Sequence, residues 1–138
     1  MGSTKSVQLE WTGDNLSFKG KGRDSESPEV TLDPQSKLGP TPMDALLIAA
    51  AGCSGADVVS ILKKMRVDLK SVSIEIDGDR REEHPKRYTA LRYRFIMSGE
   101  GLDKAKADRA VGLSIEKYCS VLHSLSPDIH LSHETEVV

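Results

Sequence analysis

The sequence predicts an α+β domain in which antiparallel sheets pack on two main helices. Three observations indicate this class: strand-like alternation recurs in adjacent runs, one long apolar stretch has a marked helix start, and a second stretch near the C-terminus has helical spacing. The expected order of elements is βββ-α-ββ-α-β. The chain has 138 residues, of which 38% are hydrophobic and 29% charged. That size and composition fit one globular domain over residues 1–138.

Alternating apolar and polar residues predict three short strands near the N-terminus. In the first of them Val7, Leu9 and Trp11 share one face. A Gly-Asp-Asn turn then leads back into the second strand, which makes a hairpin. The expected strands cover residues 6–12, 16–19 and 29–32, and a polar loop covers residues 20–28.

A helix start is well marked at Thr41. Its hydroxyl can cap the helix, Pro42 suits the first helical position, and Asp44 completes a Thr-x-x-Asp capping arrangement. The helix is predicted to continue to about Arg66. Its first half is apolar all round, which is typical of a buried central helix. Because so small a sheet covers little of a helix this long, we expect a second subunit to help enclose it in a homodimer.

The C-terminal half predicts three further strands and a second helix. Apolar residues alternate from Leu91 to Met97 and form one face of the longest of these strands. The highly charged segment 79–87 is expected to be a solvated loop. The expected strands cover residues 72–78, 91–97 and 129–137, and the expected helix covers residues 103–124.

Charge and composition exclude several classes of partner. The net charge is −2, which gives no electrostatic reason to expect a nucleic acid or an anionic membrane. The longest apolar run, residues 45–53, is too short to span a bilayer, and no signal peptide precedes it. The first six residues fit a loose myristoylation pattern, which we interpret as an ordinary start. We therefore expect a cytoplasmic protein. Phosphate-binding loops and serine-hydrolase motifs are absent from the sequence, which counts against nucleotide-dependent and serine-hydrolase functions. We expect no cofactor.

The two cysteines, Cys53 and Cys119, are where chemistry is expected. In a reducing compartment, paired thiols are more often redox-active or buried than joined in structural disulfides. Cys53 lies about three turns into the predicted central helix, and its plainest interpretation is a small buried apolar residue. The glycines at 52 and 55 favour a second interpretation, because they cost helix stability and leave room beside the sulfur for another group.

A reactive Cys53 needs a cation to stabilise its thiolate. It lies too far inside the helix to gain much from the helix dipole, which fades within a turn of the end. The cation must therefore come from elsewhere in the fold, and a loop arginine such as Arg23 is the first candidate. The arginines considered are Arg23, Arg80, Arg81, Arg92 and Arg94.

Cys119 is expected near the C-terminal end of the second helix. The dipole disfavours a thiolate there, which favours Cys119 as the resolving partner of Cys53. His123 lies four residues later on the same helix face, so half of a zinc site or a base for the thiol is conceivable. However, His130 and His133 point to opposite faces of a strand, and no metal-binding motif accompanies them. We expect no metal.

Two segments of the chain each contain one of the cysteines: residues 38–53 (LGPTPMDALLIAAAGC) with their continuation through residue 66, and residues 116–121. They resemble the first and second cysteine segments of the osmotically inducible protein C (OsmC) family. The order of elements matches over nearly the whole chain. The resemblance implies an intertwined α+β homodimer with active sites at the subunit interface. It also implies thiol peroxidase activity towards organic hydroperoxides, with Cys53 peroxidatic and Cys119 resolving.

The resemblance also implies an arginine and a glutamate around the thiolate. Arg23 lies in roughly the region of the family arginine. The family glutamate directly follows the proline that opens the helix, where this chain has Met43, and Asp44 comes one residue later. This departure indicates a divergent OsmC-like subgroup. The expected site is therefore Cys53, Cys119, Arg23 and Asp44.

Two functions follow as hypotheses. In the first, the Cys53 thiolate attacks a hydroperoxide, Cys119 condenses with the resulting sulfenic acid, and a cellular dithiol reduces the disulfide. In the second, the protein is a non-catalytic binding module that holds a small apolar or thiol-reactive ligand at the dimer interface. Met43 in place of an acidic residue favours the second hypothesis.

Overall fold

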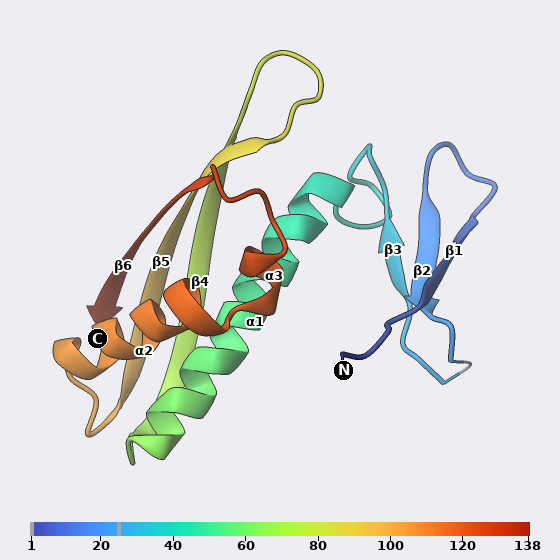
Figure 1. Ribbon diagram of the computed structural model, residues 1–138. Coiled ribbons are helices and arrows are strands. Elements are labelled where there is room, and N and C mark those ends of the chain that lie inside the picture. Colours follow the sequence, from blue (N-terminus) through green and yellow to red (C-terminus); the bar gives the residue numbers. More distant parts are fainter. Residues whose placement is uncertain (1, 25) are drawn as a thin grey trace. The chain divides into compact units, whose positions relative to one another are not determined.

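Two three-stranded sheets organise the chain, each in its own unit (Figure 1). The computed structural model describes residues 2–24 and 26–138. The first unit ends at Leu46 and the second runs from Leu47 to Val138. This α+β architecture, with two sheets and the predicted order of strands and main helices, confirms the expected fold class.

The first unit contains an antiparallel meander. Its strands pair in the order β1-β2-β3, with Leu9 opposite Gly20 and Gly20 opposite Val30. The side chains of Val7, Leu9 and Trp11 are all more than half exposed, so the apolar face of this sheet is uncovered within the unit. The strands are β1 (Val7–Trp11), β2 (Phe18–Gly22) and β3 (Val30–Leu32). The predicted loop therefore begins after Gly22 rather than at residue 20.

A tight loop follows β3 and leads into the long helix. The carboxylate of Asp33 accepts hydrogen bonds from the backbone amides of Gln35, Lys37 and Leu38 at 2.9–3.2 Å. These bonds hold the pKa of Asp33 below its usual range. At Gly39 the backbone passes so close to β3 that a Cβ atom would lie 2.0 Å from the carbonyl oxygen of Thr31.

Helix α1 (Pro42–Lys64) begins and ends as its sequence dictates. The hydroxyl of Thr41 accepts a hydrogen bond from the amide of Asp44 at 3.0 Å, which confirms the predicted cap. At the other end Arg66 adopts a φ of 63°, and the amide of Val67 bonds back to Leu62. This left-handed residue with its backward hydrogen bond closes the helix.

Burial on α1 is confined to one stripe. The buried residues follow each other at four-residue spacing: Ala50, Ser54, Val58 and Leu62. Ile48 and Val59, by contrast, are 59% and 44% exposed. Among the described residues, α1 is the one helix long and apolar enough to cross a membrane by length and composition, with 22% of its most apolar stretch buried. A single such helix is a weak indication of a membrane span, because core helices of soluble proteins meet the same criterion.

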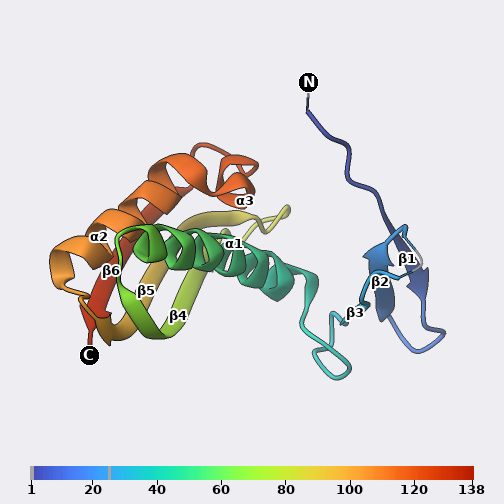
Figure 2. The ribbon, with the colours of Figure 1, turned by 90° about the horizontal axis from the view of Figure 1, so that it is seen from below.

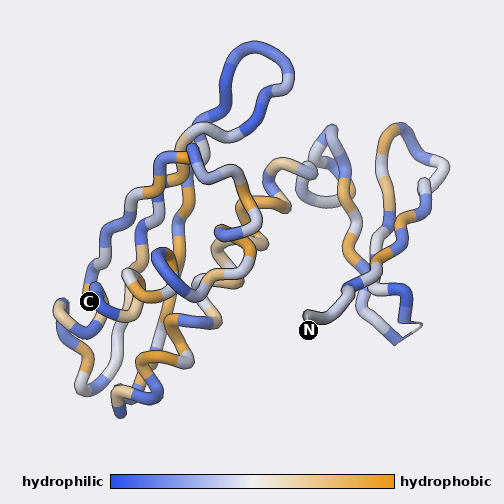
Figure 3. The backbone as a smooth tube through the Cα atoms, viewed as in Figure 1, coloured by the Kyte–Doolittle hydropathy of each residue, from blue (hydrophilic) through white to orange (hydrophobic). Residues whose placement is uncertain are grey.

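The second unit is a sheet covered on one face by helices (Figure 2). Leu91, Phe95 and Met97 are buried under the helices, as their alternation predicts. Hydrophilic residues fill the loop between the first two strands of this sheet (Figure 3). The strands are β4 (Asp68–Arg80), β5 (Tyr88–Glu100) and β6 (His130–Val137). Both β4 and β5 are longer than expected, since they pair along almost their whole length.

Strand β6 pairs with β5 in parallel, with Tyr93 opposite His133. The antiparallel arrangement expected throughout the sheets is therefore wrong for this pair. The reason is the connection: the chain leaves β5, runs back through the C-terminal helices and enters β6 in the same direction, as a crossover requires. The β4–β5 pair, joined by a hairpin loop, is antiparallel as expected.

The second predicted helix, over residues 103–124, is broken in the structure. It is an α-helix, α2 (Lys104–Leu113), followed by a π-helical turn, η1 (Ser114–Tyr118), and a short helix, α3 (Ser120–His123). The residue between the last two segments is Cys119, whose backbone is extended at φ −69° and ψ 103°. A single regular helix through Cys119 is therefore not formed.

Replacement of Gly39 tests the tight loop. Gly39→Ala is expected to lower the free energy of unfolding by about 1–3 kcal/mol, because the backbone must shift to accommodate the added Cβ. Gly112→Ala is the matched control: the same atom meets nothing within 4 Å in α2, and stability should rise by about 0.5–1 kcal/mol. Urea unfolding followed by circular dichroism measures both. Equal effects of the two substitutions would contradict the packing.

Candidate functional site

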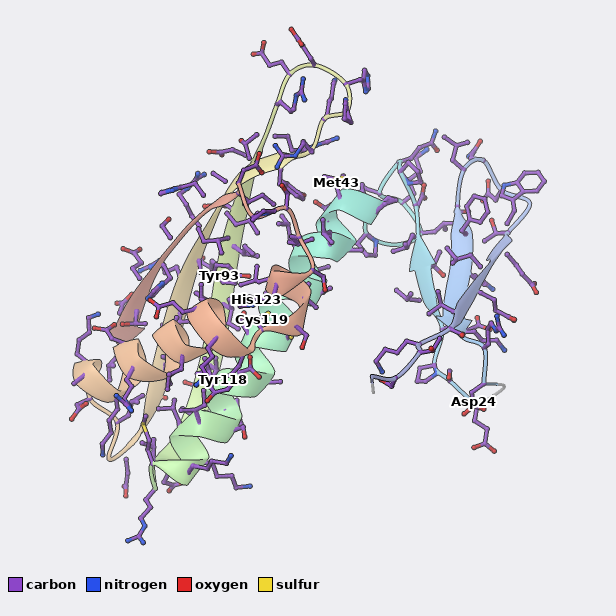
Figure 4. All side chains as sticks on the ribbon, viewed as in Figure 1. Asp24, Met43, Tyr93, Tyr118, Cys119 and His123 are labelled. Atoms are coloured by element: carbon purple, nitrogen blue, oxygen red, sulfur yellow. The ribbon has the colours of Figure 1, made fainter. Side chains whose placement is uncertain are left out.

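The two thiols come from segments that are far apart in sequence. Cys53 lies in the middle of α1 and is partly exposed, whereas Cys119 is fully buried between η1 and α3. Both are free thiols. The Cys119 sulfur lies 4.0 Å from the carbonyl oxygen of Ala50, on the buried stripe of α1. Figure 4 shows Cys119 at the break between the C-terminal helices, with His123 beside it.

The break in the helix is built from specific hydrogen bonds. The amide of Cys119 donates to the carbonyl of Ser114 at 2.8 Å, which closes the π-helical turn. The hydroxyl of Ser114 donates to the Asp57 carboxylate at 2.8 Å and so ties this turn to α1. Such π-helical turns often occur at functional sites, since the extra residue redirects the chain.

The helix-dipole argument for Cys119 is wrong. Because the helix breaks at this residue, Cys119 caps the start of α3 instead of ending α2. Its sulfur accepts a hydrogen bond from the amide of Leu122 at 3.5 Å. An amide donor favours negative charge on the sulfur, which is the opposite of the expected effect.

The two sulfurs are close enough to affect each other's protonation. Burial raises the pKa of the Cys119 thiol, and its contact with Cys53 raises it further. The Ser54 hydroxyl and the Leu122 amide act in the opposite direction. Two cysteines 66 residues apart in sequence are therefore neighbours in the second unit.

Two buried hydroxyl groups complete the surroundings of Cys119. Ser54 is fully buried on α1, and Tyr93 is 2% exposed on β5, where its ring stacks on Phe95. Within the described residues neither hydroxyl has a hydrogen-bond partner of ordinary geometry. Burial raises the pKa of Tyr93 to about 12, and the Ser54 hydroxyl lowers it. Leaving a buried polar group unsatisfied costs about 1–3 kcal/mol.

The two glycines beside Cys53 have different roles. A Cβ atom at Gly55 would lie 2.9 Å from Ile74 of β4, so this glycine lets α1 approach the sheet. A Cβ atom at Gly52 would meet nothing within 4 Å. The space expected beside the sulfur is therefore found at Gly52 and not at Gly55.

Several of the candidate arginines have partners away from the thiols. Arg92 forms a bidentate ion pair with Asp79, and Arg94 pairs with Glu75. These side chains alternate with Tyr93 and so point to the face of the sheet opposite the helices. Two further candidates interact with residues of the β4–β5 loop. Arg80 donates a hydrogen bond to the carbonyl oxygen of Lys86, and Arg81 forms an ion pair with Glu83.

The ring of His123 contacts the backbone around Cys119. The two ring nitrogens of His123 lie 2.9 Å from the carbonyl oxygen of Cys119 and 3.1 Å from that of Glu116. The ring therefore braces the backbone of the break instead of contacting the sulfur. Over residues 2–24 and 26–138, no group of three or more His, Cys, Asp or Glu side chains could hold a metal ion.

The structure brings Cys53 and Cys119 together in the second unit, whereas Arg23 and Asp44 belong to the first. The sequence singled out both cysteines. It missed Tyr93 as a part of the site, because this residue follows the alternation of an ordinary buried strand. The one available signal was its phenolic oxygen on an otherwise apolar face.

Fold and thiol pair together define a class: an α+β protein whose central helix carries a cysteine next to a second cysteine from a C-terminal helical segment. Residues 34–134 match the family model for OsmC-like protein. The chain belongs to the OsmC-like family, which confirms the resemblance seen in the sequence.

Individual relatives agree with this assignment. The chain is 39% identical to Protein YhfA of Escherichia coli K12 over 96% of its own length and 97% of the relative's. It is similar to the crystal structure of a hypothetical protein from Aquifex aeolicus, with a TM-score of 0.85, 35% identity and 99% coverage of both chains. An organic hydroperoxide resistance protein OsmC from Legionella pneumophila shares the fold, with a TM-score of 0.69 at 15% identity and 98% coverage of both chains.

Removal of the Tyr93 hydroxyl tests its unsatisfied burial. Tyr93→Phe is expected to leave the free energy of unfolding at neutral pH unchanged, or to raise it by up to about 1 kcal/mol. A folded pKa near 12, above the unfolded value of about 10, favours the native state fully below pH 10, and this contribution is lost as pH rises towards 12. Tyr93→Phe should therefore lose less stability than the unaltered protein between about pH 8 and pH 11.

Urea unfolding at the two pH values measures this difference. Tyr118→Phe is the control, because Tyr118 is 50% exposed. It should keep the alkaline loss of the unaltered protein. A clear destabilisation by Tyr93→Phe at neutral pH would mean that its hydroxyl is satisfied in solution.

Proposed function

We propose that the protein is a dithiol-dependent thiol peroxidase that reduces organic hydroperoxides in oxidative-stress defence. The observation that carries the proposal is the neighbourhood of Cys53 and Cys119, which come from distant segments and affect each other's protonation. Membership in a family that includes organic hydroperoxide resistance proteins supports it. We place this activity in the cytoplasm, where cellular dithiols keep thiols reduced.

The proposed reaction has three steps. The thiolate of Cys53 attacks the distal oxygen of the hydroperoxide, which releases an alcohol and leaves a sulfenic acid on Cys53. The sulfur of Cys119 then displaces hydroxide, which leaves as water, and a disulfide forms. A dithiol finally reduces the disulfide. The partial exposure of Cys53 and the burial of Cys119 fit this division of labour, since the first sulfur must meet the substrate.

Arg23 and Asp44 are proposed to complete the site. Arg23 would stabilise the Cys53 thiolate. Asp44 would supply a carboxylate one residue after Met43, which stands where the family has its glutamate. Support for Arg23 comes from the second unit, where Arg92 and Arg94 pair with carboxylates on the opposite face of the sheet. A cation for Cys53 is thereby sought outside that sheet.

Serine substitutions separate the roles of the two cysteines. Cys53→Ser is expected to abolish consumption of cumene hydroperoxide in the presence of dithiothreitol, a loss of at least about 100-fold. Without dithiothreitol, Cys119→Ser should still react once and then accumulate a sulfenic acid on Cys53, which dimedone traps. Peroxide consumption and mass spectrometry measure the two effects. A fully active Cys53→Ser variant would refute the mechanism.

We further propose that the protein acts as a homodimer. On α1, Ile48 and Val59 are exposed and lie about three turns apart on one helix face, with the open position Gly52 between them. The apolar side of the β1-β2-β3 sheet is uncovered within its unit as well. Contiguous apolar surfaces of this kind mark protein interfaces, and a second copy would cover them.

A charged residue on α1 tests the dimer. Val59→Asp is expected to shift the mass in light scattering from twice 15.1 kDa towards the monomer value, because burial of an unpaired charge at an interface is costly. Ser73→Asp on the exposed face of β4 is the control and should leave the mass unchanged. A dimer that survives Val59→Asp would show that this face of α1 is not the interface.

A second candidate function is a non-catalytic binding module for a small apolar or thiol-reactive ligand. Met43 in place of the family's acidic residue and the raised pKa of Cys119 favour it. The peroxide assay separates the two functions. Turnover beyond one equivalent supports the peroxidase, whereas stoichiometric modification of Cys53 without turnover supports the binding module.

A further inference from the structure

Two hydroxyl groups that have no hydrogen bond to another described residue lie next to the Cys119 sulfur. Ser54 and Tyr93 come from different elements, α1 and β5, and both are almost fully excluded from solvent. Burial raises the pKa of Tyr93 and of Cys119, and the Ser54 hydroxyl lowers both. The two hydroxyls and the sulfur therefore form one buried polar group. Figure 4 shows Tyr93 and Cys119 in the same region of the second unit.

Among the described residues, the Ser54 hydroxyl has no hydrogen bond to its usual partner in a helix. A serine inside a helix normally donates to the carbonyl oxygen four residues earlier. For Ser54 this is the carbonyl of Ala50, which lies 4.0 Å from the Cys119 sulfur and has no hydrogen bond from the Ser54 hydroxyl. The Ser54 hydroxyl thus lies on the helical turn that the Cys119 sulfur contacts, and its proton is free to be donated to that sulfur.

The Cys119 sulfur needs a donor on this side when it carries charge. As a thiol it donates towards the Ala50 carbonyl, but as a thiolate it would face the lone pairs of that oxygen. On its other side the Leu122 amide already donates to it at 3.5 Å. A buried charge is tolerated only when donors surround it. Among the described residues, the Ser54 and Tyr93 hydroxyls are the buried side-chain groups that have no other partner.

We propose that Ser54 and Tyr93 are positioning residues for the sulfur of Cys119. When the sulfur carries negative charge, the hydroxyl of Ser54 donates to it, and the hydroxyl of Tyr93 donates to the oxygen of Ser54. The role of this donor pair in turnover rests on the proposed peroxidase function, whereas its effect on Cys119 does not. Tyr93 stays protonated throughout and acts only as a donor.

The donor pair acts where charge develops on Cys119. In the resolving step the Cys119 sulfur attacks the sulfenic sulfur of Cys53, so that an S–S bond forms and the S–O bond breaks. The sulfur of Cys119 is oxidised, that of Cys53 is reduced, and the Cys119 proton leaves with the hydroxide as water. When a dithiol later attacks Cys53, Cys119 leaves as a thiolate, and the same donors stabilise it. The hydroxyls gain and lose no proton overall.

The first experiment measures the acidity of Cys119 without any peroxide. In a Cys53→Ser protein labelled with ¹³C-cysteine, the Cβ chemical shift of Cys119 is followed against pH. Added Ser54→Ala is expected to move the midpoint up by about one unit, which is tenfold in the dissociation constant, and added Tyr93→Phe by less. Ser60→Ala, on the exposed side of α1, and Tyr118→Phe are the matched controls and should leave it unchanged.

The second experiment measures the resolving step in chains that contain both cysteines. After one equivalent of cumene hydroperoxide, Ser54→Ala and Tyr93→Phe should lengthen the lifetime of the Cys53 sulfenic acid by about tenfold, as dimedone trapping at timed intervals reports. The rate at which peroxide is first consumed should stay the same. A general structural defect would slow both steps, so the split between them identifies the effect on Cys119.

Each result decides a separate question. An unchanged Cys119 midpoint in both Ser54→Ala and Tyr93→Phe overturns the donor pair, and Tyr93→Phe alone decides it if Ser54→Ala does not fold. A raised midpoint in a protein that consumes no hydroperoxide supports the donor pair and refutes the proposed function. A raised midpoint with an unchanged sulfenic-acid lifetime overturns the role of the pair in resolution.

Discussion

The contact between the buried stripe of α1 and the break at Cys119 is the constraint on which the second unit depends. It places the Cys119 sulfur beside the Ala50 carbonyl and next to Cys53. Ala50 itself lies one helical turn before Ser54. The Ser114–Asp57 hydrogen bond fastens the π-helical turn to α1 nearby. Because α1 also packs on β4 through Gly55, the helix couples the thiols to the sheet. Displacement of this one helix would separate Cys53 and Ser54 from Cys119 and Tyr93.

The same helix explains why one chain leaves its apolar residues uncovered. Only one stripe of α1 is buried by the sheet and the C-terminal helices, and the opposite face is open in the single chain. The first unit has a comparable deficit, because its three strands form a single layer with an exposed apolar face. Exposed apolar surfaces of this kind often mark protein interfaces. The uncovered apolar surfaces in both units are those that the proposed second copy would cover.

Features that depend on neighbouring residues could be predicted from the sequence. The cap at Thr41 and the alternation along β5 are local, and both were correct. The helix break could not be predicted, because it depends on a hydrogen bond from Ser114 to Asp57, which lies 57 residues earlier. The parallel pairing of β6 is likewise decided by the path of the chain and not by residues in the strand. Both features lie in the C-terminal third, where tertiary contacts override local periodicity.

The site shows the same division. Both cysteines could be found from the sequence, since cysteine is rare in this chain and its chemistry is distinctive. Tyr93 could not be found in this way. It follows the apolar alternation of a core strand, which accounts for its ring and gives no sign of a role for its hydroxyl. What distinguishes Tyr93 is visible only in the three-dimensional structure. Among the described residues its buried oxygen has no hydrogen-bond partner, and neither does the neighbouring oxygen of Ser54.

The lack of hydrogen bonds at the Ser54 and Tyr93 hydroxyls argues that they act in the reaction and do not stabilise the fold. If Ser54 and Tyr93 served only to fill the core, alanine and phenylalanine would fill it without desolvating two hydroxyl groups. A hydroxyl that is unsatisfied beside a neutral thiol becomes satisfied once that thiol is a thiolate, because the charged sulfur is a far better acceptor. The polar groups around Cys119 are thus matched to a charged sulfur better than to the neutral thiol. This arrangement is expected when hydrogen bonds form only in the state in which the sulfur is charged, because such bonds stabilise that state more than the resting thiol.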